Sequence, residues 1–391
     1  MRYIFFFLAM ILAVFGNTYI SDYIGYSMRT TVAFTLLILY CLYKFTKGEY
    51  TNKTDNTYKH IIIVGVLIII VHLLLGNNYI QSMLTMVFIP CLFYIFFIRL
   101  NKKEKSIFRL ALIILFLVNC SIAIWEHHNQ TFFIKHEISK IDLLESWSFR
   151  ARALLGHPLA NALIMSPMIL YILISDLNIK IKLVLFAIGE YALFCFNTRS
   201  GLLATTICAI PLLYKEIKKQ NRTVRKYYYI TILLIGVLSI TYIINNNIGG
   251  RLVNISSNEG FLSDGSSLAR LEILDFVDYI STDELIFGSP ESYDKLLIAM
   301  NLMGVENGLV TLILTYGIFL GLSLAFCLIL FYWKRMAYLG NTERICIMAC
   351  YIGIGLTNPH IAYSLAWYYF LFDFIAFIPW NNYIKLKESK I

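Results

Sequence analysis

Long apolar runs separated by short polar segments dominate this chain. A helix that crosses a bilayer needs about 20 predominantly apolar residues, within a range of about 17–25. The pattern predicts twelve spans, and the shorter ones imply partial burial or unequal tilt. They are residues 3–17, 28–45, 60–76, 79–98, 107–125, 158–175, 181–197, 200–214, 227–245, 306–333, 343–358 and 361–380. We therefore expect an all-α polytopic integral membrane protein, with residues 1–391 forming a single transmembrane domain.

Basic residues collect in alternate connections between these spans. Short cytoplasmic loops of membrane proteins are enriched in Lys and Arg. The basic connections are 44–59, 99–109, 176–182, 215–226, 334–344 and 385–390. The neutral, mixed or acidic connections are 17–27, 76–78, 126–157, 197–201, 245–305 and 358–360. This alternation predicts that both termini are cytoplasmic and that the second group of connections lies outside.

The composition agrees with a membrane class. The chain is 59% hydrophobic and 15% charged, whereas a soluble domain is nearer half apolar and a quarter charged. A formal charge of +9 would suggest nucleic acid in a soluble protein. Here the basic residues fall between apolar runs, so we expect membrane lipids and no nucleic acid as partners. The eight cysteines show no disulfide framework or zinc spacing, and no cleavage site follows the first apolar run, so that helix is expected to remain.

The connection at 245–305 is the longest polar stretch, and it carries nine acidic residues against three basic ones. Apolar residues at helical spacing predict one interfacial helix at 268–280. The other large outer loop is 126–157. We interpret 245–305 as an extracytoplasmic lid over a site at the membrane edge.

Outer-face arginines are the first candidates for chemistry. Arg199 lies in the short turn 197–201, and Arg270 lies in the long loop. An interfacial anchor explains Arg199, and a salt bridge with a loop acid explains Arg270. Alternatively, both bind an anion, because a guanidinium group offers a planar fork of donors that matches phosphate oxygens. Arg150 and Arg152 are expected to contact lipid headgroups or the phosphates of a substrate.

Glu306 opens the helix after the long loop. A carboxylate there is favoured by the helix dipole, typically by about 0.3–1 kcal/mol; alternatively it serves as a general base for an acceptor hydroxyl. Asn307 beside it is a candidate to orient a sugar. Glu190 and Asp373 lie inside predicted spans, where an acid marks either a substrate cavity or a buried structural pair. His127, His128 and His136 have no carboxylate–histidine spacing that supports a metal site, and we expect no metal and no cofactor.

Four segments together resemble the O-antigen ligase and O-antigen polymerase superfamily of bacterial polysaccharide assembly. They are RALLGHPLANAL (152–163), NTRSG (197–201), SSLAR (266–270) and VENGLVTLILTYGI (305–318). Their order and the plan of many spans with one long outer loop also match. The likeness covers about residues 150–320, and the first five predicted helices match only in being apolar.

The resemblance implies a multi-pass glycosyltransferase of the bacterial cytoplasmic membrane. Its donor would be a glycan on undecaprenyl pyrophosphate, and arginines matching Arg199 and Arg270 bind the pyrophosphate in that family. The ligases usually begin the helix after the loop with His. Here Glu306-Asn307 keeps the frame, with nine residues before Gly317, but replaces the His. That departure favours the polymerase branch.

We therefore expect an enzyme that transfers a glycan to a lipid-linked repeat unit outside the cytoplasmic membrane, for O-antigen, capsule or exopolysaccharide. Glu306 would take the proton of the acceptor, and Arg199 and Arg270 would stabilise the leaving pyrophosphate. The leaving group is already activated, and no paired-Asp metal motif is evident, so we predict metal-independent catalysis. A chain-length regulator and a flippase are the expected protein partners. The alternatives are a ligase acting on lipid A-core or protein, a lipid-linked-oligosaccharide transporter, and a non-catalytic assembly protein.

Overall fold

The computed structural model describes residues 58–97, 100–133, 149–230, 241, 272–300, 302, 304–362 and 364–388. The predicted spans 3–17 and 28–45 lie outside the described residues, as do most of 227–245 and the loop residues 134–148 and 245–271. The described part is helical and contains no strand, which confirms the all-α class.

The described helices follow the predicted apolar runs, with three sharp departures at 79–98, 268–280 and 306–333. The main ones are α4 (Lys59–Leu74), α5 (Ile80–Met83), the π-helix η1 (Leu84–Phe88), α6 (Ile89–Phe97), α7 (Lys102–Asn129), η2 (Ala153–Leu155), α9 (Pro158–Ile174), α10 (Ile179–Cys195), α11 (Arg199–Lys218), η5 (Ile273–Asp278), α14 (Thr282–Phe287), α15 (Pro290–Ala299), α16 (Gly308–Tyr316), α17 (Ile318–Arg335), η6 (Met336–Tyr338), α18 (Asn341–Gly355), η7 (Pro359–Ala362), α19 (Ser364–Phe377) and α20 (Trp380–Glu388). Within the described part, α7, α11 and the stretch 318–338 are long and apolar enough to cross a membrane.

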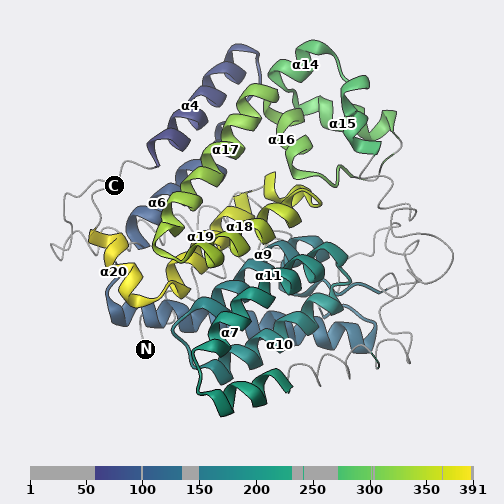
Figure 1. Ribbon diagram of the computed structural model, residues 1–391. Helices are drawn as coiled ribbons and strands as arrows, with labels where there is room; N and C mark the ends of the chain where they lie inside the picture. Colours follow the sequence, from purple (N-terminus) through teal and green to yellow (C-terminus); the bar gives the residue numbers. More distant parts are fainter. Residues whose placement is uncertain are drawn as a thin grey trace.

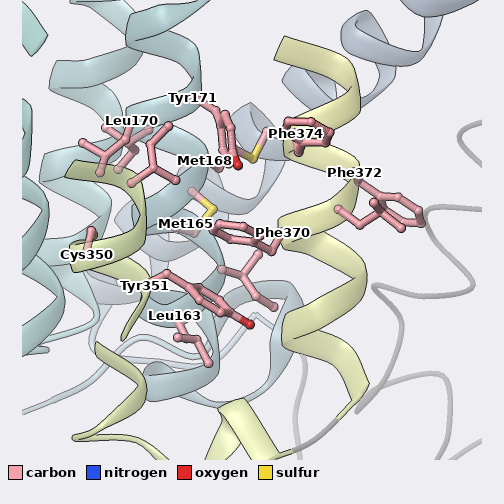
Figure 2. Packing of buried hydrophobic residues seen from close by; sticks show 14 of the residues in the cluster. Leu163, Met165, Met168, Leu170, Tyr171, Cys350, Tyr351, Phe370, Phe372 and Phe374 are labelled. Carbon is pink, nitrogen blue, oxygen red and sulfur yellow. The ribbon is translucent and has the colours of Figure 1, made fainter. Parts of the chain in front are cut away.

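Helix α9 is the centre of the bundle, and every one of its residues is buried. It packs against α10, α11, α18 and α19 (Figure 1). A helix that is apolar on all sides needs such complete enclosure. Figure 2 shows how this works: Met165, Met168 and Tyr171 of α9 meet Tyr351 of α18 and Phe370 of α19 in one packed layer.

Polar contacts tie the helix ends together at what we call the basic end of the bundle. Arg109 of α7 pairs with Asp176, which follows α9, and its Nε donates to the carbonyl of Ala376 on α19 at 2.9 Å. Lys182 of α10 pairs with Glu216 of α11 at 2.7 Å. Charged ends of four helices therefore meet on one side of the bundle.

The opposite side, which we call the loop end, gathers the other helix termini. The start of α9 meets the segment that follows α18, since Nδ2 of Asn358 donates to the carbonyl of Leu159 at 2.6 Å. Gly201, near the start of α11, lies against Ala162 of α9, so these two helices begin at the same end. Helices α9, α10 and α11 thus alternate in direction; which end faces the cytoplasm stays a prediction.

The predicted single span 306–333 is wrong, because the chain breaks at Gly317 into α16 and α17. Gly317 has φ +81° and ψ 160°, a conformation open almost only to glycine. The two helices pack against each other, and Gly321 of α17 lies against the backbone of Leu312. The π-helix η1 is the second departure; it ends two residues before Pro90, which has no backbone N–H to donate within a helix.

The predicted amphipathic helix at 268–280 is also wrong in type over the residues that are described. The 3₁₀-helix η5 occupies Ile273–Asp278, and α14 and α15 follow it. The three elements pack on α16 around a small core of their own that includes Ile273, Phe276 and Leu296. In Figure 1 they lie together at the upper right, beside the start of α17. We call residues 272–300 the lid.

Candidate functional site

The loop end carries a short turn at residues 150–156, which we call the arginine turn. Its backbone is anchored to the α10–α11 connection, since the amide of Ala151 donates to the carbonyl of Cys195 at 3.1 Å. Nε of Arg150 also approaches the carbonyl of Phe196 at 3.5 Å. Arg150 and Arg152 are therefore held beside the turn that leads to Arg199.

Arg199 is the first residue of α11, and the preceding turn has a constrained backbone. Asn197 has φ +51°, which few residues other than glycine and asparagine adopt easily. A Cβ atom added at Gly201 would lie 2.9 Å from the Cβ of Ala162, so α11 must keep a glycine where it crosses α9. The sequence NTRSG therefore places Arg199 at the loop end, near the start of the central helix α9.

Glu306 precedes α16, and its neighbour caps the helix. Oδ1 of Asn307 accepts the amides of Leu309 and Val310 at 3.0 and 3.2 Å. The expectation that Glu306 itself opens the helix is thus wrong: Asn307 supplies the cap, and α16 begins at Gly308. Glu306 is half-buried and lies directly before this cap.

The lid and η7 set the position of Glu306. The hydroxyl of Tyr293 on α15 accepts the amide of Val305 at 3.3 Å. Helix α16 packs against η7, and η7 contacts α9. Contacts therefore run from the arginine turn, across the start of α9 and η7, to α16, the helix that follows Glu306. Arg270 lies outside the described residues.

Glu190 and Asp373 lie farther from this surface. Glu190 sits a little over one turn before the end of α10, where the hydroxyl of Thr206 donates to it at 3.2 Å. Asp373 is about one turn before the end of α19, near the basic end, and is fully buried. In the described part of the protein, neither of its carboxylate oxygens has a hydrogen-bond partner. The structure thus brings Arg150, Arg152, Arg199, Glu306 and Asn307 to one end and leaves Asp373 at the other.

The candidate histidines have aromatic neighbours. Nε2 of His128 is 2.8 Å from the hydroxyl of Tyr191, and His127 makes an edge contact with Phe194. His136 lies outside the described residues. Across the described ranges, no group of three or more His, Cys, Asp or Glu side chains is arranged to hold a metal ion.

Sequence reasoning missed three buried polar residues at the loop end: Glu126, Asn119 and Asn161. Nδ2 of Asn119 donates to Oδ1 of Asn161 at 2.9 Å, and Asn161 in turn donates to the carbonyl of Arg152 at 2.6 Å. The carboxylate of Glu126 accepts the amides of Arg152 and Ala153. A polar residue inside an apolar run is a signal for a buried network, and that signal would have found Asn119 and Asn161.

Across the described residues, these features define an all-helical protein of membrane type. Comparison with known protein families and with curated proteins finds no match to this chain. The residues at the loop end are therefore the basis for inferring a function.

Proposed function

We propose that the protein is a membrane glycosyltransferase, a polysaccharide polymerase of the bacterial cytoplasmic membrane. Its donor is a glycan chain on undecaprenyl pyrophosphate, and its acceptor is a single lipid-linked repeat unit. The product is O-antigen, capsule or exopolysaccharide. The loop end faces outward and the basic end faces the cytoplasm, which accords with the enrichment of Lys and Arg in cytoplasmic loops.

One observation carries the proposal: three arginines and a carboxylate that is not a helix cap share the loop end. Arg150 and Arg152 lie just before α9, and the turn that leads to Arg199 contacts the arginine turn and α9. The short helix η7 contacts both α9 and α16, the helix that follows Glu306. Guanidinium groups bind phosphate oxygens in pairs of parallel hydrogen bonds. A pyrophosphate with a sugar attached needs both groups, arginines for the phosphates and a base for the incoming hydroxyl.

In the proposed reaction, an acceptor hydroxyl oxygen attacks the anomeric carbon of the donor glycan. The new carbon–oxygen bond forms as the bond from that carbon to the phosphate oxygen breaks, and the pyrophosphate takes the electron pair. Glu306 accepts the proton of the hydroxyl, an effect typically worth about 10²–10⁴-fold. Arg199 and, from the long loop, Arg270 offset the charge that grows on the pyrophosphate, with Arg150 and Arg152 assisting.

The other candidate residues have narrower parts in this proposal. Asn307 fixes the start of α16 through its side-chain oxygen and so places Glu306 and any sugar beside it. Glu190 of α10 lies beside Thr206 of α11, farther from the loop end than Arg199 is. Glu190 is proposed to line the substrate path. The lid packs on α16 and is proposed to cover the site. The chain-length regulator and the flippase remain proposed partners.

The test replaces Arg199 with Ala, Arg270 with Ala, or Glu306 with Gln in the native strain, and separates the surface glycan on a gel. A polymerase defect leaves one repeat on the final acceptor. A ligase defect leaves lipid-linked polymer with no attached glycan, and loss of all lipid-linked glycan on the outer face indicates a transporter. Normal chain lengths in all three variants would exclude a catalytic role.

Two variants serve as controls for these substitutions. Arg222→Ala removes an exposed arginine from the segment after α11, on the basic side. Glu291→Gln changes an exposed acid on the lid helix α15. Both should give normal chain lengths, because neither residue belongs to the loop-end surface that holds Arg199 and Glu306.

A further inference from the structure

The side chain of Glu126, near the end of α7, is fully buried at the loop end. One oxygen of its carboxylate accepts the amide of Phe133 at 3.0 Å. The other accepts the amides of Arg152 at 2.7 Å and Ala153 at 2.9 Å. A single carboxylate therefore joins two segments of chain that lie on either side of residues 134–148.

The arginine turn needs this support because of its backbone conformation. Ala153 has φ +43°, in the left-handed region that brings Cβ too close to the following carbonyl oxygen. Asn119 accepts the amide of Leu154 at 3.0 Å, and Asn161 donates to the carbonyl of Arg152 at 2.6 Å. Hydrogen bonds from buried side chains thus hold the turn in a strained backbone conformation. Strained conformations held in this way occur most often at functional sites.

The same carboxylate sets the surroundings of the Arg152 guanidinium. The central carbon of the Arg152 guanidinium lies 4.5 Å from the centre of the Phe132 ring. Phe132 in turn stacks on Phe149, with ring centres 5.1 Å apart. Glu126 holds the amide of the next residue, Phe133. The backbone beside the ring and the backbone of Arg152 are therefore both held by one side chain, and a cation–π contact of this kind orients the guanidinium group.

A carboxylate suits this place better than an amide does. Three backbone N–H groups point at its two oxygens, and an ionised carboxylate only accepts hydrogen bonds. In a glutamine, one terminal atom becomes an N–H donor, which would oppose a backbone donor. Glu126→Gln therefore weakens the frame while it keeps the size of the side chain.

We infer that Glu126 is a positioning residue, which fixes the arginine turn so that Arg150 and Arg152 bind the pyrophosphate of the lipid-linked substrate. This inference rests on the proposed function for the identity of the ligand. Glu126 itself does not touch the reacting atoms; it acts through the backbone of Arg152 and Ala153. It therefore controls binding of the pyrophosphate and leaves proton transfer unchanged.

The experiment uses the full chain in lipid nanodiscs and compares wild type with Glu126→Gln. The matched control is Glu104→Gln: Glu104 is also a buried glutamate of α7 and also accepts a backbone amide, that of Asn101 at 3.0 Å, but at the basic end. Hydrogen exchange is measured at the amides of Phe133, Arg152 and Ala153, with the Ala151 amide as reference. Binding of undecaprenyl pyrophosphate is titrated in the same discs.

We expect exchange at the three amides to be at least tenfold faster in Glu126→Gln and unchanged in Glu104→Gln. Undecaprenyl pyrophosphate should bind about tenfold more weakly to Glu126→Gln only. Adding Ala153→Gly to that variant should recover much of the affinity, because glycine adopts positive φ without strain. In glycan transfer, KM for the donor should rise, while kcat and its dependence on pH stay near those of wild type.

Unchanged exchange at Arg152 and Ala153, or unchanged affinity despite faster exchange, would overturn the inference. Loss of one limb of the pH–rate profile would also overturn it, because Glu126 would then be a catalytic residue. If wild type binds undecaprenyl pyrophosphate but transfers no glycan, the proposed function fails, and weaker binding by Glu126→Gln still supports the positioning role. If wild type does not bind this lipid at all, both proposals fall.

Discussion

Gly288 and Gly317 face each other, backbone against backbone, where the lid meets the break between α16 and α17. A Cβ atom at Gly317 would lie 2.1 Å from the carbonyl oxygen of Ile286, and one at Gly288 would lie 2.4 Å from the amide nitrogen of Gly317. Both glycines have positive φ, and the amide of Ser289 donates to the carbonyl of Leu314 at 3.0 Å. This contact fixes the lid to the helix that follows Glu306.

The first prediction concerns these two glycines. Gly317→Ala and Gly288→Ala should each release the lid, because the substituted residue both strains the backbone and collides with the opposite chain. Gly76→Ala tests the strain alone, since Gly76 also has positive φ but has nothing within 4 Å of an added Cβ; it should cost about 1–2 kcal/mol. We expect protease cleavage within 272–300 to increase in the first two variants and to stay at the wild-type rate in Gly76→Ala. Equal rates in all three would show that the contact does not hold the lid.

The break at Gly317 is a feature that the sequence alone does not predict. Apolar residues continue on both sides of it, and one glycine inside a helical pattern costs only about 1 kcal/mol, so the pattern predicts a single span. The break is imposed by contact with Gly288, which is remote in the sequence. In contrast, the starts of α14 and α15 were readable: Ser281 forms a capping box with Glu284, and Ser289 precedes Pro290.

At the loop end, likewise, some features are predictable from the sequence and others are not. The apolar runs and their polar ends predict that Arg199 and Glu306 lie at helix termini. Arg199 is indeed the first residue of α11, whereas Glu306 lies two residues before α16. The frame around Arg152 was not predictable, because Glu126 binds backbone amides 26 and 27 residues away. A backbone partner leaves no trace in residue type, so only the fold reveals it.

The second prediction concerns the pH dependence of the Arg109–Asp176 pair. Burial raises the pKa of Asp176, but the hydrogen bond and charge of Arg109 outweigh burial and hold the pKa below its ordinary value of 3.8. A carboxyl with a lowered folded pKa stabilises the protein above its unfolded pKa, and this contribution is lost as pH falls through the folded pKa. Wild type should therefore unfold at a higher temperature than Asp176→Asn at pH 7, and the difference should vanish well below pH 3.8. The side chain of Asp176 is 42% exposed, so solvent screening keeps the difference small. A difference that persists unchanged at the lowest pH would contradict the assignment.

The third prediction concerns the pair of Lys182 and Glu216, whose side chains are 3% and 14% exposed. Removing Glu216 strands a buried ammonium group, whereas removing Lys182 leaves Glu216 in contact with Lys219. Breaking a buried pair from one side costs about 3–5 kcal/mol, so Glu216→Gln should approach this range and Lys182→Met should cost less. The double variant should cost less than the two single costs combined.

Denaturant unfolding of the purified protein in detergent measures these costs. Lys180→Met is the matched control, because Lys180 lies exposed in the first turn of the same helix, and it should change stability little. Additive single costs would show that Lys182 and Glu216 do not interact energetically.

The last prediction separates Asp373 from the loop-end site. Its carboxylate is fully buried near the basic end, and neither oxygen has a hydrogen-bond partner in the described structure. Burying a polar group without a partner destabilises a fold, so replacement by an apolar residue of similar size should relieve that cost. Asp373→Leu should therefore unfold at a higher temperature in detergent than wild type and should still make polymer of normal length. Asp373→Asn keeps the shape and an unpaired polar group, so it should gain less. If Asp373→Leu folds but stops polymer formation as Glu306→Gln is expected to do, Asp373 belongs to the substrate path, and the interior of the bundle, not only its loop end, takes part in the reaction.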